Sequence, residues 1–151
     1  MLKRFIISAG IVSALVISGC ASVPMASKEE DLALKQFPAP PDNLAGLYVY
    51  RNSSVGQALY KTVKLDGQEI GETANEVYFY RTITPGNHVL ATESEFSDNE
   101  VNFTAKEGNN YYAEQYIKMG VFVGGANIRM VSESVGQQNV KECALAIGKV
   151  E

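Results

Sequence analysis

Four carboxylates lie close together in the middle of this sequence and could do chemistry. They belong to Glu93, Glu95, Asp98 and Glu100. Carboxylate oxygens are ligands for a hard cation such as calcium, and two facing carboxylates are the machinery of glycoside hydrolysis. The spacing lacks the glycine and the final glutamate of an EF-hand loop. We interpret these acids as a solvated loop and strand face, with a hydrolase and a calcium-stabilised module as alternatives.

His88 is the single histidine of the chain. A catalytic triad or a zinc site needs partner residues that the sequence around it does not supply. A structural or surface role is therefore favoured, although a histidine with a pKa of about 6.5 could respond to acidity around the protein. The sequence predicts a protein that is not an enzyme, with no catalytic residue, no metal and no cofactor.

Cys20 directly follows a segment typical of an export signal. Lys3 and Arg4 give a positive start, residues 5–17 form an apolar run, and small residues precede the cysteine. The run has roughly 13 residues, whereas a membrane-spanning helix needs about 20. The ending Ile17-Ser18-Gly19-Cys20 resembles the bacterial lipobox. We expect cleavage between Gly19 and Cys20 and transfer of a diacylglycerol to the Cys20 thiol.

A lipid on Cys20 would anchor the mature chain in a bilayer. Stable anchoring needs two or more acyl chains, and the lipobox resemblance implies three. Residue 21 is Ala, whereas an Asp there usually retains a lipoprotein in the inner membrane. The resemblance therefore implies the outer membrane, and we expect the chain to face the periplasm. The alternatives are an ordinary signal peptide with a free Cys20 thiol and a buried helix of a cytosolic protein.

Composition limits what the mature chain can bind. Removal of residues 1–19 leaves 11 basic against 17 acidic residues, a net charge of about −6. Such a charge argues against nucleic acid and against electrostatic attraction to anionic lipid headgroups. Cys143 would be left without a cysteine partner, so we expect a small buried residue, with an intermolecular disulfide as the alternative.

Three segments follow from the patterns. Residues 1–19 are the signal, and residues 20–45 are predicted to form a tether that carries four of the five prolines. Within it, Ser27 and Glu30 form a capping box that predicts a short helix over residues 28–36. Residues 46–151 are the predicted domain.

The domain is predicted to be mainly β. Apolar alternation and turn residues indicate seven or eight short strands, at residues 47–51, 59–65, 68–72, 77–80, 88–92, 101–105, 111–118 and 128–130. Asp66-Gly67 is a strong hairpin signal. We expect a small antiparallel β-sandwich, immunoglobulin-like or transthyretin-like. One C-terminal helix should cover it, with Val140, Cys143, Ala144 and Ile147 on its apolar face.

Two features could provide a contact surface. Tyr48, Tyr50, Tyr78 and Tyr80 form two pairs at i and i+2, so each pair shares a strand face. Such rings could stack on a ligand, but cross-strand packing is favoured. The segment 120–125, with Phe122 at its centre, is apolar between glycines. It could touch a membrane or a partner, and a short core strand is the favoured interpretation.

Several motifs in order resemble those of a known family. They are Tyr48-Val49-Tyr50-Arg51, Val63-Lys64-Leu65-Asp66-Gly67-Gln68-Glu69-Ile70-Gly71, Thr84-Pro85-Gly86-Asn87-His88 and Lys106-Glu107-Gly108-Asn109-Asn110-Tyr111-Tyr112. Together they are similar to the bacterial lipoprotein family labelled domain of unknown function 2846, over residues 37–146. The resemblance implies a β-sandwich-like extracytoplasmic domain and implies no reaction.

The sequence as a whole favours a lipid-anchored envelope protein with a binding or assembly role. Its expected partners are the bilayer, through Cys20, and an unidentified envelope protein or peptide. The candidate contact residues are Tyr48, Tyr50, Tyr78, Tyr80 and Phe122.

Overall fold

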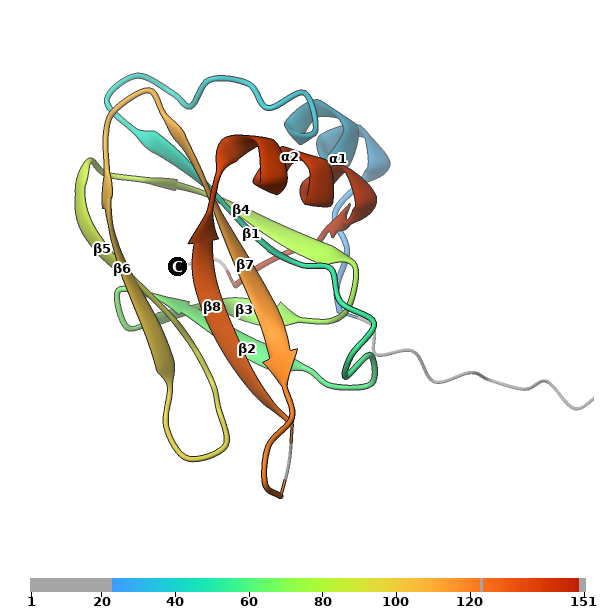
Figure 1. The fold of residues 1–151 in the computed structure, drawn as a ribbon. Helices are drawn as coiled ribbons and strands as arrows, with labels where there is room; N and C mark the ends of the chain where they lie inside the picture. Colours follow the sequence, from blue (N-terminus) through green and yellow to red (C-terminus); the bar gives the residue numbers. More distant parts are fainter. Residues whose placement is uncertain (1–22, 123, 150–151) are drawn as a thin grey trace, which may run out of the picture.

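The protein is mainly β, as the alternation predicts. A computed structural model describes residues 23–122 and 124–149, which contain nine strands in two sheets and two helices. The five-stranded sheet lies between the four-stranded sheet and the helices (Figure 1). The predicted β-sandwich with one C-terminal helix is confirmed.

Each sheet combines strands from distant parts of the chain. The five-stranded sheet has the order β8 (Gly125–Val131), β7 (Asn110–Lys118), β1 (Ala45–Arg51), β4 (Val77–Ile83) and β9 (Ala144–Leu145). The four-stranded sheet has the order β3 (Gln68–Thr73), β2 (Lys61–Leu65), β5 (Gly86–Thr92) and β6 (Asn99–Ala105). The helices are α1 (Lys28–Leu34) and α2 (Glu133–Glu142).

Two pairings in the five-stranded sheet are parallel, a detail that the antiparallel prediction missed. β1 pairs parallel with β7, and β4 pairs parallel with β9. Parallel neighbours need a long connection, and the four-stranded sheet lies between β1 and β7 in the chain. Hairpin signals describe only neighbours in sequence, so they gave no information on this pairing.

β1 is the central strand and is buried along its whole length. Leu47 and Val49 face the four-stranded sheet and belong to the core between the sheets. Tyr48 and Tyr50 face the other way, under the helices. Because successive side chains of a strand point to opposite faces, β1 contributes to both apolar layers.

The Asp66-Gly67 turn forms the β2–β3 hairpin as predicted. Leu65 pairs with Gln68, and the two turn residues have φ of 51° and 83°. Positive φ at both positions is the type I′ geometry that matches the twist of a hairpin.

The predicted tether is, in its described part, packed on the domain. The capping box forms, with Ser27 and Glu30 bonded reciprocally, and α1 ends at Leu34, slightly before the predicted end. The Tyr48 hydroxyl donates to the Leu34 carbonyl at 3.1 Å, and the Leu145 amide donates to the Asp31 carboxylate at 3.0 Å. Without a cover the tyrosine face of the five-stranded sheet would be exposed, and this segment supplies part of that cover.

The C-terminal helix is shorter than its apolar spacing predicts. α2 ends at Glu142, and Cys143 is already extended, with φ −95° and ψ 167°. Ala144 and Leu145 then form β9, and Ile147 is 54% exposed. The predicted helical face through Ala144 and Ile147 is therefore wrong, because pairing with β4 satisfies the backbone that another helical turn would have used.

Gly136 sets how closely α2 approaches the sheet. A Cβ built on Gly136 would lie 2.3 Å from the Cβ and Cγ atoms of Tyr112. These atoms are the base of a buried ring, so they cannot move aside as the end of a flexible side chain could. Glycine allows the helix backbone to pack directly on Tyr112.

Replacement of Gly136 by Ala tests this contact, because helix propensity and packing predict opposite signs. Propensity alone predicts a gain of about 1 kcal/mol. Overpacking costs about 1–3 kcal/mol, and we expect the free energy of unfolding to fall. Urea denaturation measures it, with Gln138→Ala on the exposed side of α2 as a near-neutral control. A stabilised Gly136→Ala variant would refute the close approach.

Candidate functional site

The two sheets meet at one end of the sandwich, where three loops gather. Strand register places the loops 52–60, 93–98 and 119–124 at that end, because Thr92 pairs with Asn99 and Lys118 pairs with Gly125. The Asn99 side-chain amide donates to the Ala126 carbonyl at 2.7 Å and so joins the sheets there. We call this the loop end. In Figure 1 the β5–β6 and β7–β8 loops project from it together.

Four exposed apolar side chains lie on two of these loops. The exposed fractions are 79% for Phe96, 89% for Met119, 78% for Val121 and 83% for Phe122, the highest of the large apolar side chains in the described residues. We call these four residues the apolar tip. Single exposed apolar residues need no explanation, but their grouping at one end is typical of a contact site.

Glu95 joins the two loops of the apolar tip. Its carboxylate accepts hydrogen bonds from the backbone amides of Val121, at 2.8 Å, and Phe122, at 2.5 Å. Charge-assisted bonds of this kind are stronger than neutral ones. Glu95, the neighbour of Phe96, therefore holds the segment that carries Phe122. These hydrogen bonds fix the two loops that carry the phenylalanines to each other.

The apolar tip corrects one prediction from the sequence. The segment 120–125 was expected to form a short core strand, but Val121 and Phe122 are exposed and β8 begins only at Gly125. A Cβ on Gly125 would lie 2.7 Å from the Ser94 hydroxyl oxygen, so this glycine allows close approach of the neighbouring loop. Val121 and Phe122 therefore face solvent instead of entering the core.

The four clustered carboxylates do not converge. Glu93 forms an ion pair with Lys61 at 3.3 Å, and Asp98 forms one with Lys64 at 2.6 Å. Glu95 holds the tip, and Glu100 is exposed on β6. Among the residues that the structure describes, no group of three or more His, Cys, Asp or Glu side chains is placed to hold a metal ion. Glu93, Asp98 and Glu95 therefore hold neighbouring segments in place, and the four acids do not form a catalytic pair or a cation site.

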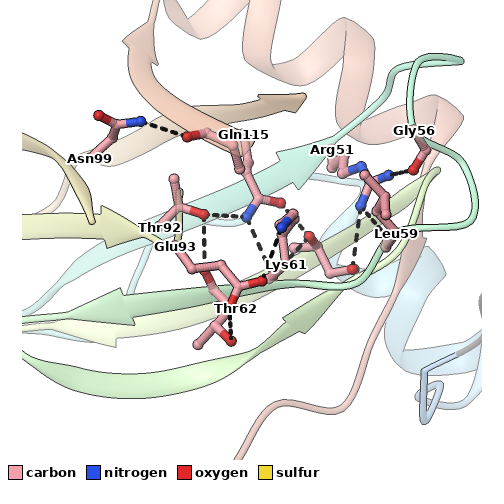
Figure 2. A network of polar contacts seen from close by, with 11 residues as sticks. Arg51, Gly56, Leu59, Lys61, Thr62, Thr92, Glu93, Asn99 and Gln115 are labelled. Atoms are coloured by element: carbon pink, nitrogen blue, oxygen red, sulfur yellow. Dashed lines mark hydrogen bonds and ion pairs between the residues drawn. The ribbon is translucent and has the colours of Figure 1, made fainter. Parts of the chain in front are cut away.

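A buried polar network lies directly beneath the loop end (Figure 2). Arg51 is fully buried, and its guanidinium donates to the carbonyls of Leu59, at 2.6 Å, and Gly56. Burial lowers the pKa of Arg51 from its ordinary value. The cation thus holds the loop 52–60 against the sheet through main-chain oxygens.

Gln115 extends the network across the sandwich. Its side-chain amide donates to the Thr92 hydroxyl at 2.7 Å, and its carbonyl oxygen accepts from the Thr73 hydroxyl. Thr92 in turn donates to the Thr62 carbonyl at 2.9 Å. The Gln115 amide also donates to the Lys61 carbonyl at 3.4 Å, so one residue of β7 binds three strands of the other sheet. Figure 2 shows Gln115 pointing toward Thr92.

The residue patterns of the sequence do not reveal this network. Gln115 shares a strand face with the buried Ala113 and Ile117, so a polar residue at an inward position was the available signal. Arg51 at the end of an otherwise apolar strand was a similar signal. Neither residue type indicates its partners, because those partners are main-chain carbonyls and hydroxyls far along the chain.

The tyrosines form a core and not a contact face. Tyr48, Tyr50 and Tyr78 are fully buried, and Tyr80 is partly buried beside them. The Tyr48 ring lies 4.7 Å from that of Tyr80 and stacks at 5.1 Å on that of Tyr112, between centroids. Burial raises the pKa of Tyr48 and Tyr78. Cross-strand packing, the favoured interpretation, explains these residues, and the fully buried Tyr48, Tyr50 and Tyr78 present no surface to a partner.

Phe37 covers the tyrosine cluster from the segment before β1. Its ring meets Tyr48 edge-on at 5.6 Å and Tyr112 edge-on at 6.0 Å. Of the predicted contact residues, only Phe122 is thus exposed, at the loop end. The structure separates it from the tyrosines.

His88 has a structural setting. It is buried at the end opposite the loop end, with Nδ1 2.6 Å from the Asp66 carboxylate and Nε2 2.7 Å from the Thr84 carbonyl. Burial lowers the pKa of His88, but the bond to Thr84 and the bond and charge of Asp66 outweigh it, so the net shift is upward. Two acceptors on the two ring nitrogens favour the imidazolium.

Cys143 is buried and carries a free thiol. Burial is the main cause that raises its pKa to about 12, so the thiol is unreactive at neutral pH. Its predicted role as a small buried residue is confirmed. The predicted cleavage and lipidation residues, Gly19 and Cys20, lie outside the described residues.

Comparison with known proteins agrees with the resemblance seen in the motifs. The family described as protein of unknown function DUF2846 matches residues 41–126. A protein of Haemophilus influenzae described as uncharacterized is 46% identical over 146 residues, which cover 96% of this chain and 87% of that protein. No solved structure matches.

Thr92→Val tests the network below the loop end. Valine keeps the shape but removes the hydroxyl that accepts from Gln115 and donates to Thr62. A buried donor without a partner costs about 1–3 kcal/mol, and we expect the free energy of unfolding to fall by that amount. Thr104→Val, which removes an exposed hydroxyl bond on β6, is the matched control. Equal losses in both variants would contradict the network's importance.

The Asp66–His88 pair predicts a pH dependence of stability. The raised pKa of His88 means that its contribution is full below pH 6.5, its ordinary value, and is lost as pH rises through the folded-state pKa. The lowered pKa of Asp66 gives a contribution present above pH 3.8 and lost as pH falls through its folded-state pKa.

Thermal unfolding of wild type and His88→Gln across this range measures the effect. The stability difference between them should be largest between pH 3.8 and 6.5 and should shrink at higher pH. Asp66→Asn should lose the same dependence, because it removes the anion. Parallel pH profiles for wild type and His88→Gln would refute the charged pair.

Proposed function

Because this chain belongs to the DUF2846 family of proteins of unknown function, we propose its function from its own residues. It is an envelope lipoprotein, anchored through Cys20 in the outer membrane and facing the periplasm. Its domain has a non-catalytic binding or assembly role there. The apolar tip, with Phe122, is its contact surface.

The N-terminal sequence carries this proposal. Lys3 and Arg4, the apolar run and the ending Ile17-Ser18-Gly19-Cys20 together have the layout of an exported and lipidated precursor. Cys20 is then the cysteine available to a lipid, because the Cys143 thiol is buried in the tyrosine cluster. Neither α1 nor α2, the helices of the described residues, has the length and apolar character to cross a membrane.

The choice of the outer membrane is inferred from residue 21, which directly follows the anchor. Ala21 stands where an Asp would favour retention in the inner membrane. The partner binds by apolar contact, because the apolar tip is the grouped exposed apolar surface of the described residues. Charged side chains of the same loops are already engaged with Lys61 and Lys64. These features support a binding protein held close to a membrane.

Cys20→Ala tests the anchor. The variant should fold, because residue 20 precedes the packed segment that starts at Val23, and it should move from the membrane fraction to the soluble fraction. Incorporation of labelled palmitate should be lost at the same time, because the thiol is its acceptor. Fractionation and immunoblotting measure the first effect.

Cys143→Ala is the matched control, since it removes the other cysteine and should leave the chain lipidated and membrane-bound. Retention of Cys20→Ala in the membrane fraction, or labelling of that variant with palmitate, would contradict the proposed function.

A further inference from the structure

We propose that the apolar tip inserts into the same bilayer that holds the lipid of Cys20, so that the domain lies on the membrane by its loop end. This inference rests on the proposed lipid anchor and names the partner of the tip. It is carried by three observations: where the described chain begins, which charges surround the tip, and how the tip is held.

The described chain begins near the loop end. Val23 and Pro24 line one surface hollow together with Thr62, Glu69, Gly71 and Glu72. Thr62 is at the start of β2 and Glu72 is near the end of β3, and both of these strand ends face the loop end. The anchor is therefore attached at the same end of the sandwich as the apolar tip, although it lies at the β3–β9 edge and the tip at the β6–β8 edge.

The segment after Val23 is hydrogen-bonded to the domain, so it cannot act as a flexible spacer. The Ile147 amide donates to the Pro24 carbonyl at 2.8 Å, and the Ala26 amide donates to the Leu145 carbonyl at 3.0 Å. Cys20 is three residues before Val23, and three residues span at most about 10 Å. A lipid on Cys20 therefore holds this side of the domain at the membrane surface.

The chemistry of the tip suits lipid. Phe96, Phe122, Met119 and Val121 have no polar group in their side chains, so they lose nothing by leaving water. The acids of the loop 93–98 are compensated, Glu93 by Lys61, Asp98 by Lys64 and Glu95 by two backbone amides. Lys118, exposed at the base of the tip, is placed to keep its ammonium at the headgroups while its stem lies against apolar surface.

The anchor also explains why a small apolar tip suffices. A tethered group meets its second site at a high effective concentration, so a weak contact becomes populated without extended complementarity. Glu95 presents Val121 and Phe122 in one orientation before contact, which lowers the entropy lost on insertion. A bilayer requires no further shape from the protein.

The test places a fluorophore at the tip of the lipidated mature protein. Phe122→Cys introduces a reactive thiol at a side chain that is 83% exposed. The buried Cys143 should not react, so wild type treated with the same maleimide-linked nitrobenzoxadiazole shows the background. The labelled protein is reconstituted in protein-free vesicles of phosphatidylethanolamine and phosphatidylglycerol. Asn109→Cys, exposed at the opposite end, is the matched control.

Insertion predicts a blue shift of the label at position 122 and quenching by nitroxides on the acyl chains, at every ratio of protein to lipid. The label at position 109 should remain in water and be quenched by iodide. Equal iodide quenching at both positions would overturn the inference.

Two further outcomes name other occupants of the tip and also overturn it. A blue shift seen only in native membranes would assign the tip to a protein partner, and a shift that grows with protein density would assign it to a second copy of the chain. Mass spectrometry of the purified protein separates the anchor from the tip. An unmodified Cys20 would overturn the proposed function together with this inference, whereas lipidated protein with a water-exposed label would overturn the inference alone.

Discussion

Burial of both faces of β1 is the constraint on which the fold depends. A strand with Leu47 and Val49 on one face and Tyr48 and Tyr50 on the other needs an apolar layer on each side. The four-stranded sheet provides one layer. The other must cover several tyrosine rings, which contribute large buried areas and prefer defined ring geometries. The helices, Phe37 and β9 together form this cover, so three layers follow from one central strand.

The cover brings the two ends of the described chain together. Asp31 in α1 accepts a hydrogen bond from Leu145 in β9, and the Pro24 carbonyl accepts one from Ile147. Residues before the domain therefore become part of it. A spacer would let the domain move freely around a membrane anchor, whereas a bound segment gives it a preferred face. The packing of the tyrosine layer and the proposed orientation on the membrane thus have the same physical origin.

The loop end reverses the usual distribution of polarity. Arg51 and Gln115 are buried there, while Phe96 and Phe122 are exposed. The hydrogen bonds of this buried network join strands of both sheets and so favour one arrangement of them. It gives the loops a rigid base, and Glu95 then fixes the tip on that base. Exposed apolar side chains on a rigid support are more suited to contact than to core packing.

Local patterns in the sequence determined the strands, the Asp66-Gly67 hairpin and the capping box at Ser27, because each depends on residues within a few positions of one another. The tertiary structure decided the parallel pairing of β7, the burial of the tyrosines, the end of α2 and the exposure of Phe122. An apolar residue in a sequence shows a tendency to be buried, but not which distant segment covers it. The cover of Tyr48 comes from Leu34 and Phe37, and Phe122 is held by Glu95, and contacts between such separated residues exist only after the chain has folded.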